Sequence, residues 1–133
     1  MMIGAVDDWR KWALFTVPEG GAWTAGAIAL LGDAAHAMLP FAAQGAGMAI
    51  EDAAVLAKCL AENAEESAAV VAALKRYARL RRARIHRVQR AARQAGRTYH
   101  LTGPAAYARD LVIRAMGAKR VLARQNWIYD WQA

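Results

Sequence analysis

The stretch from Gly32 to Gly47, GDAAHAMLPFAAQGAG, holds the residues whose types and spacing point most clearly to ligand chemistry. It follows the apolar run AIALL and places one carboxylate, Asp33, directly after Gly32. In open α/β folds, ligands bind at the carboxyl edge of the sheet. A carboxylate at that edge accepts hydrogen bonds from the hydroxyls of a sugar or polyol. We therefore expect Asp33 to follow a buried strand and to bind such hydroxyls.

Two glycines, Gly45 and Gly47, stand where a helix is predicted to open. Because glycine has no Cβ, a ligand can approach the backbone N–H groups closely. The positive end of the helix dipole faces the same place. The stretch thus suits a ligand with hydroxyls at one end and an electron-rich or anionic group at the other. Spacing alone leaves open an ordinary strand–turn–helix in which Asp33 is only a capping residue.

The elements that would position these residues are few. Strands are predicted at WALFTVP (residues 12–18) and AIALLGD (27–33), separated by the turn PEGGAW. Helices are predicted over Met48–Leu60, from Ala68 to about Gln94, and from Pro104 to Met116, just before Gly117. One or two strands make a sheet too small to cover both faces. The predicted fold class is therefore α/β, or an α+β fragment, mostly helical after residue 47, whose sheet has further strands outside this chain.

Charge divides the chain into two halves. Residues 1–67 carry three basic and nine acidic side chains, whereas residues 68–133 carry fifteen basic and two acidic ones, for a net charge of +7. We predict a division at the same point, into a sheet-containing part (1–67) and a C-terminal helical region that packs on it (68–133). The basic half is expected to bind nucleic acid, an acidic protein surface or an anionic cofactor.

The arginines between Arg76 and Arg97 mix helix faces and have little aromatic interleaving, so a solvated or interface-forming face is favoured over nucleic-acid binding. One of them, Arg81, falls in the apolar arc of the long predicted helix and interrupts it. The single cysteine, Cys59, is expected to be a buried small residue. With no disulfide possible, no signal peptide and no long apolar run, a cytoplasmic protein that does not bind a membrane is predicted.

The segment GDAAHAMLPFAAQGAGMAIEDAAVLA closely resembles the second flavin-binding motif of class A FAD-dependent aromatic monooxygenases, and most of all their salicylate hydroxylase-like branch. The resemblance extends through ALKRYARLRRARIHRVQRAAR and YHLTGP to WIYDW, and so covers nearly the whole chain. The family's G-x-G-x-x-G turn for the FAD pyrophosphate has no counterpart in these 133 residues. The resemblance therefore implies the last third of such an enzyme, inactive by itself.

The resemblance assigns roles by position. Asp33 corresponds to the acid that hydrogen-bonds the ribityl chain of FAD, and Pro40 to the proline lining the substrate side of the flavin. Backbone amides at the pyrimidine end correspond to Gly45, Ala46 and Gly47. The whole implied cofactor-binding set is Gly32, Asp33, Gln44, Gly45, Ala46 and Gly47. FAD is the implied cofactor, with NAD(P)H as co-substrate, and the implied partners are a small aromatic substrate and either the absent FAD-binding segment or a second copy of the chain.

Other candidates have weaker support. His36 lies three residues after Asp33 and is read either as a catalytic base or as a structural histidine that steadies the turn. The three histidines lack metal-ligand spacing, so no metal is expected. Glu51 and Asp52 are interpreted as charges that complement the helix dipole. Two alternatives to hydroxylation stay open: a flavin oxidoreductase that does not hydroxylate, and a basic helical module that binds a partner without catalysis.

Overall fold

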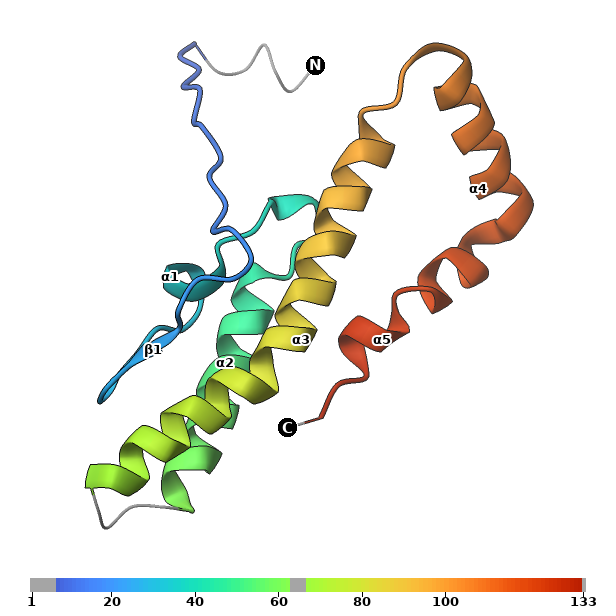
Figure 1. Ribbon diagram of the computed structural model, residues 1–133. Coiled ribbons are helices and arrows are strands. Elements are labelled where there is room, and N and C mark those ends of the chain that lie inside the picture. Colours follow the sequence, from blue (N-terminus) through green and yellow to red (C-terminus); the bar gives the residue numbers. More distant parts are fainter. Residues whose placement is uncertain (1–6, 63–66, 133) are drawn as a thin grey trace.

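The computed structural model describes residues 7–62 and 67–132. Within them, the elements in chain order are β1 (Thr24–Ala25), β2 (Ile28–Ala29), α1 (Asp33–His36), the 3-10 helix η2 (Pro40–Ala42), α2 (Gly45–Ala61), α3 (Ser67–Tyr99), α4 (Gly103–Ala123) and α5 (Asn126–Tyr129). Helices α2 and α3 lie side by side and antiparallel, and α4 turns away from the end of α3 before α5 returns toward its middle (Figure 1). The described chain is thus mostly helical, as predicted for the part after residue 47.

The core lies where α2 and α3 meet, under the hairpin and α1. Helix α3 contributes Tyr77, Ile85 and Val88 from its apolar arc, and α2 contributes Met48, Val55 and Cys59, which are seven and four residues apart and so lie on one face of a helix. The buried cluster consists of Trp23, Ala35, Met48, Val55, Cys59, Ala73, Tyr77, Ala78, Ile85 and Val88. The burial of Cys59 confirms its predicted place among small core residues.

The α/β class is not confirmed, because the described residues contain only a two-stranded antiparallel sheet. Thr24 pairs with Ala29 and Ala25 with Ile28, around a turn in which Gly26 has a φ of 55°. The predicted strand that ends at Asp33 therefore stops at Ala29, and Asp33 opens α1 instead. A strand needs a neighbour for its N–H and C=O groups, and within residues 7–62 and 67–132 the edges of this hairpin have no further strand.

The predicted strand at residues 12–18 is also wrong. This segment is extended but belongs to no sheet, and the side chains of Trp12 and Phe15 are 80% and 82% exposed. A backbone hydrogen bond from Val17 to the carbonyl of Ala37 ties its end to the segment after α1. The β-prone composition of this segment predicts the extended backbone, but no strand of the described chain lies beside it. The predicted division of the chain at residue 67 stays a prediction.

The predicted helices are present, but several of their boundaries differ from the predictions. Helix α2 begins at Gly45, three residues before the predicted start at Met48, and α3 runs past Gln94 to Tyr99. Gly117 leaves the helical region with φ 71° and ψ 157°, which confirms the predicted stop after Met116, although the chain turns helical again up to Ala123. The residues after Gly117, for which no helix is predicted, also contain the one-turn helix α5. None of the helices within residues 7–62 and 67–132 has both the length and the apolar character needed to cross a membrane.

Gly96 lets the 3-10 helix η2 pack directly on α3. A Cβ added to Gly96 would lie 2.5 and 2.7 Å from Cδ2 and Cε2 of the Phe41 ring. The same ring contacts Tyr99 and His100 edge-on, with centroid separations of 6.4 and 5.3 Å. Since η2 holds Pro40 and leads into Gln44, the loop that precedes α2 is positioned by this close contact.

Replacing Gly96 by Ala is expected to lower the free energy of unfolding by about 1–2 kcal/mol. Overpacking typically costs about 1–3 kcal/mol, and the 2.5 Å approach to Phe41 places this case toward the upper end, above the gain of about 1 kcal/mol from helix propensity. The sign should reverse in a Phe41→Ala background, where the methyl group has room. Urea denaturation of the two single variants and the double variant measures this coupling. A Gly96→Ala variant that is more stable with Phe41 in place would contradict the contact.

Candidate functional site

The turn at Gly32 presses against helix α2. Gly32 is buried and has φ 60° and ψ −141°, a conformation that favours glycine. A Cβ added there would lie 3.2 Å from Cβ of Ala49 on α2. Its N–H donates to Oδ2 of Asp52 at 3.0 Å, and its carbonyl accepts from the N–H groups of Ala35 and His36. Position, conformation and hydrogen bonding therefore all fix the peptide that precedes Asp33.

The structure brings Asp33 beside the start of α2. A Cβ added to Gly45 would lie 3.9 Å from Oδ1 of Asp33, and Asp33 is exposed. Helix α2 has no side-chain cap at Gln44, and the N–H groups of the first turn of a helix have no partner within the helix. These donors belong to Gly45, Ala46 and Gly47. A carboxylate acceptor and a row of amide donors thus lie next to each other on the surface.

The loop between α1 and α2 completes this surface. Pro40 is exposed at the start of η2, and Ala43 ends η2 in the left-handed region at φ 51°, which L side chains seldom adopt. The Oε1 atom of Gln44 lies 3.5 Å from where a Cβ on Gly47 would stand. The predicted positions from Gly32 to Gly47 therefore come together around the N-terminus of α2. Their predicted roles toward a cofactor stay predictions.

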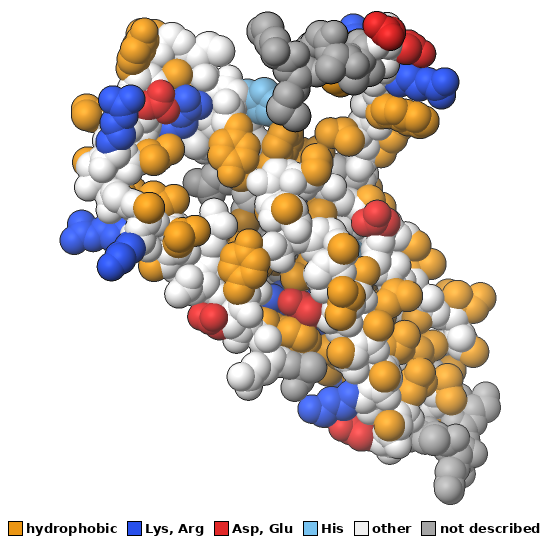
Figure 2. Space-filling view, turned by 180° about the vertical axis from the view of Figure 1, so that it is seen from behind, with side chains coloured by type: hydrophobic (Ala, Val, Ile, Leu, Met, Phe, Trp, Pro, Cys, Tyr) orange, Lys and Arg blue, Asp and Glu red, His pale blue; other side chains and the backbone are white. Residues whose placement is uncertain are grey.

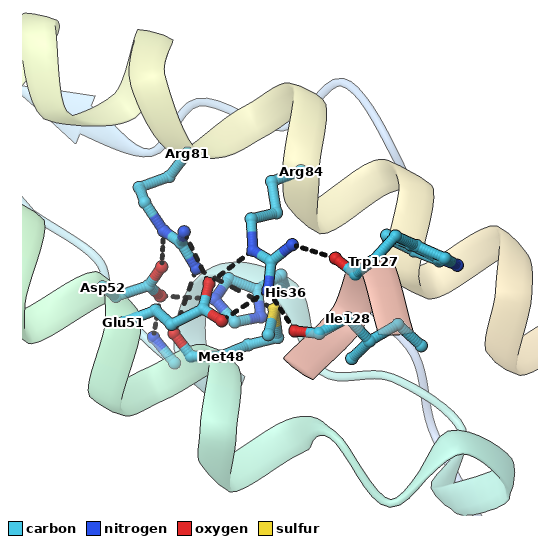
Figure 3. Close-up of polar contacts among 9 residues, drawn as sticks. His36, Met48, Glu51, Asp52, Arg81, Arg84, Trp127 and Ile128 are labelled. Atoms are coloured by element: carbon cyan, nitrogen blue, oxygen red, sulfur yellow. Dashed lines mark hydrogen bonds and ion pairs between the residues drawn. The ribbon is translucent and has the colours of Figure 1, made fainter. Parts of the chain in front are cut away.

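Beneath this surface lies a buried ionic network centred on Asp52 (Figure 3). Asp52 is fully buried. Its Oδ2 accepts from the Gly32 N–H and contacts Nε2 of His36 at 2.5 Å, while its Oδ1 accepts from Nε of Arg81 at 2.7 Å. Arg81, from α3, is 1% exposed and also pairs with Glu51 at 2.8 Å. The network holds α1, α2 and α3 together directly behind the Asp33 turn.

Arg84, one turn further along α3, extends the network to the C-terminal segment. Its Nε and one terminal nitrogen bind the two carboxylate oxygens of Glu51, both at 2.6 Å. The terminal nitrogens also donate to the carbonyls of Trp127 and Ile128, at 3.2 and 2.7 Å. Both Arg81 and Arg84 lie over the ring of Trp131, at 4.9 and 5.2 Å from its centroid.

Burial and neighbouring charges shift the pKa values of two ionisable groups in this region. Burial raises the pKa of Asp52, but hydrogen bonds from His36, Arg81 and the Gly32 N–H outweigh it and leave the pKa below its ordinary value. Burial, with the negative charge of Asp52 nearby, raises the pKa of Tyr77 well above its ordinary value. The Tyr77 hydroxyl therefore stays protonated and donates to the carbonyl of Leu30 at 3.1 Å. Asp52 stays ionised at neutral pH and can act as acceptor for all three donors.

The structure corrects our interpretation of Glu51 and Asp52 as charges on the helix dipole. The first turn of α2 contains no acidic residue, and both side chains instead pair with arginines of α3. His36 is buried and bonded to Asp52, a position that fits a residue steadying the turn. Sequence reasoning missed Arg81 and Arg84 as network residues, since both were assigned to a solvated or interface face. The interruption of the apolar arc at Arg81 was the signal that could have found them.

No group of three or more His, Cys, Asp or Glu side chains that could hold a metal ion occurs in the part of the chain that the structure describes. The chemistry of the site is instead that of a hydroxyl acceptor beside backbone donors.

Comparison with protein families identifies the class. The chain matches the family described as FAD binding domain over residues 16–92, more than half of its length. It therefore belongs to the FAD binding domain family. The match begins before the hairpin and ends within α3, so it includes the Asp33 turn, the start of α2 and the network beneath them.

Three of the similar proteins are named as monooxygenases or hydroxylases of aromatic acids. The chain is 41% identical over 133 residues to a 3-amino-4-hydroxybenzoate 2-monooxygenase of Streptomyces platensis, an alignment that covers 99% of this chain and 32% of that protein. It is 40% identical over 124 residues to 3-hydroxybenzoate 6-hydroxylase 1 of Aquipseudomonas alcaligenes, covering 92% and 30%. A salicylate hydroxylase of Pseudomonas putida is 38% identical over 119 residues, covering 90% and 26%.

These comparisons confirm the resemblance to FAD-dependent aromatic monooxygenases. The salicylate and 3-hydroxybenzoate hydroxylases among the relatives support the resemblance to the salicylate hydroxylase-like branch. The chain spans about a third or less of the length of these relatives.

The residues present fit a flavin with its ribityl chain. The exposed Asp33 carboxylate offers acceptors for hydroxyls, and the uncapped start of α2 offers donors and a positive dipole end. A side chain in place of Gly45 would project toward Asp33 and narrow the space between acceptor and donors. The glycines therefore keep open the surface that such a ligand would occupy.

Proposed function

We propose that this chain binds the ribityl and isoalloxazine part of FAD and is the C-terminal portion of an FAD-dependent monooxygenase that hydroxylates a small aromatic substrate. The observation that supports this most directly is the placement of the Asp33 carboxylate beside Gly45 at the start of α2. Membership of the FAD binding domain family and the aromatic hydroxylase relatives support it independently.

In this proposal each residue has a specific task. Asp33 accepts a hydrogen bond from a ribityl hydroxyl, and the peptide before it is held still by the bond from Gly32 to Asp52. The amides of Gly45, Ala46 and Gly47, with the dipole of α2, stabilise negative charge at the pyrimidine end of the ring system. Pro40 lines the substrate side. When bound, the flavin supplies the redox chemistry with NAD(P)H and dioxygen, and the protein excludes water from it.

The proposal also includes a partner polypeptide or a second copy of the chain. Large hydrophobic side chains are exposed along residues 9–15, the hairpin, α2 and α4; they include Trp9, Trp12, Leu14, Phe15, Ile28, Ile50, Tyr107, Leu111 and Leu122. Hydrophobic side chains gather over much of the face seen in Figure 2. Apolar surface of this extent is typical of regions that pack against another protein surface. The segment that completes the family fold is the partner that we favour.

Replacing Asp33 by Ala is expected to weaken FAD binding about ten- to hundredfold, because a hydrogen bond to an ionised acceptor contributes about 1.5–3 kcal/mol. The measurement mixes the chain with a polypeptide containing the first two-thirds of the Streptomyces platensis relative, and follows quenching of flavin fluorescence as FAD is titrated. The Asp33 side chain is exposed, so the variant should fold normally.

Asp110→Ala is the matched control, since it also removes one exposed carboxylate but lies on α4 beside Arg109. It should leave the FAD affinity unchanged. Equal affinities of the Asp33→Ala variant and the original chain would rule out the role assigned to Asp33.

A further inference from the structure

The C-terminal segment Trp127–Trp131 is attached to the rest of the protein through arginine side chains of α3. A helix of one turn leaves its last carbonyls without partners, and Arg84 binds two of those of α5, from Trp127 and Ile128. Arg87 lies 3.8 Å above the ring of Trp127. Ile128 is buried, although α5 is short and follows the largely exposed α4.

The same Arg84 is linked to the Asp33 turn by an unbroken series of charged contacts. Arg84 binds both oxygens of Glu51, Glu51 binds Arg81, and Arg81 binds Asp52. Asp52 in turn accepts the N–H of Gly32, the residue before Asp33. Figure 3 shows these side chains converging between α2 and α3, with the carbonyls of Trp127 and Ile128 at one end.

Each ion pair in this series depends on the next one because the side chains are buried away from water. Arg81 and Asp52 are almost completely buried and the Arg84–Glu51 pair is largely so. Removing one partner from a buried pair leaves the other charge uncompensated, which favours rearrangement of the whole set. Glu51 is shared by both arginines, so a change at Arg84 alters how firmly Arg81 is held against Asp52.

We propose that Arg84 is a positioning residue through which the segment Trp127–Trp131 fixes the Gly32–Asp33 turn. Docking of the segment orients the Arg84 guanidinium. This guanidinium holds Glu51 in place, and the Glu51–Arg81–Asp52 contacts hold the Gly32 peptide. The consequence for flavin affinity rests on the proposed function, whereas the effect on the turn does not.

The test is amide hydrogen exchange of the whole chain without flavin, in the original sequence and in Arg84→Lys. Lysine keeps the charge but cannot bind Glu51 through two nitrogens while also reaching the carbonyls of α5. We expect exchange at least about tenfold faster in peptides covering residues 32–37 and 126–131, in line with the loss of one charge-assisted hydrogen bond. Exchange in residues 69–75, at the distant end of α3, should not change.

Arg79→Lys is the matched control, since Arg79 is exposed on the same helix. A second variant, Ile128→Ala, loosens the segment by removing a buried apolar side chain, without changing any side chain of the charged series, and should also speed exchange at residues 32–37. Unchanged exchange at 32–37 in both variants would overturn the proposal, as would equal acceleration throughout the chain, which indicates a general loss of stability.

Flavin affinity in the mixture with the relative's first two-thirds provides the second measurement. If the turn loosens but FAD binds equally well, the positioning role stands and its link to flavin is wrong. If FAD does not bind to the mixture with the original chain, the proposed function fails, and hydrogen exchange still decides the role of Arg84.

Discussion

Replacing Asp52 by Asn is expected to lower the free energy of unfolding of this chain by about 3–5 kcal/mol, the usual cost of breaking a buried ion pair by neutralising one partner. Asp52 is fully buried and accepts from the Gly32 N–H, His36 and Arg81. Asparagine preserves the shape but leaves the buried Arg81 with only Glu51 as counter-ion. Urea denaturation at neutral pH, followed by circular dichroism, measures the change.

The pH dependence of stability supplies a second signature of the same variant. The pKa of Asp52 is lower in the folded chain than its ordinary value of about 3.9. The stabilisation that ionised Asp52 contributes to the folded chain is therefore fully present above that ordinary pKa, and it is lost as the pH falls through the pKa of the folded state. Between about pH 5 and 2, the stability of Asp52→Asn should fall less steeply than that of the original chain.

Asp110→Asn is the control for this experiment. The pKa of Asp110 is also lowered, by its hydrogen bond to Arg109, but the side chain is exposed, and such surface pairs contribute little. Its neutralisation should change neither the neutral-pH stability nor the acid slope appreciably. Similar stabilities of Asp52→Asn and Asp110→Asn would show that the buried network does not stabilise the chain.

Local sequence signals predicted the helices well because their causes are local. The apolar arc of α3, the proline start of α4 and the stop at Gly117 each depend on residues within one or two turns. Gly117 has the positive φ that its position after Met116 suggested. The predicted start of α2, Met48, is three residues too late, because the glycines at the helix opening were placed before the helix although they belong to its first turn.

Strands could not be predicted in the same way, because a strand exists only through its neighbour. Residues 12–18 have the composition of a strand, yet lie extended without pairing, and the run before Asp33 pairs over only two residues. The candidate site could likewise be predicted only in part. Gly32 and Gly45 follow from the motif and from turn chemistry, whereas the ionic network forms only where α1, α2 and α3 meet.

The role of Arg81 could not be predicted from the sequence around it. An arginine in an apolar arc indicates either an interrupted core or a buried ion pair, and the choice depends on an acid elsewhere in the chain. The acid, Asp52, lies 29 residues away on α2, and nothing in its local sequence distinguishes it from a charge near a helix start. Long-range electrostatic pairing of this kind becomes visible only when the helices are placed together.

The 133-residue chain expressed by itself is expected neither to retain FAD nor to hydroxylate an aromatic substrate. Its candidate contacts reach the ribityl chain and the ring system through Asp33 and the start of α2. The diphosphate and adenosine of FAD call for a glycine-rich turn of the G-x-G-x-x-G type, which this sequence does not contain. FAD should therefore bind the isolated chain no more tightly than riboflavin, which lacks the diphosphate and adenosine.

The measurement purifies the chain with excess FAD, passes it through a desalting column, and records the visible spectrum and NADH-driven oxygen uptake with salicylate. The control adds the first two-thirds of the Streptomyces platensis relative, which should restore the flavin spectrum. The isolated chain should also self-associate, because side chains such as Trp12, Phe15 and Tyr107 are largely exposed and apolar surface of this kind favours association. A stoichiometric flavin spectrum on the monomeric chain would contradict this expectation, since the binding energy would then have to come from contacts beyond the Asp33 turn and the start of α2.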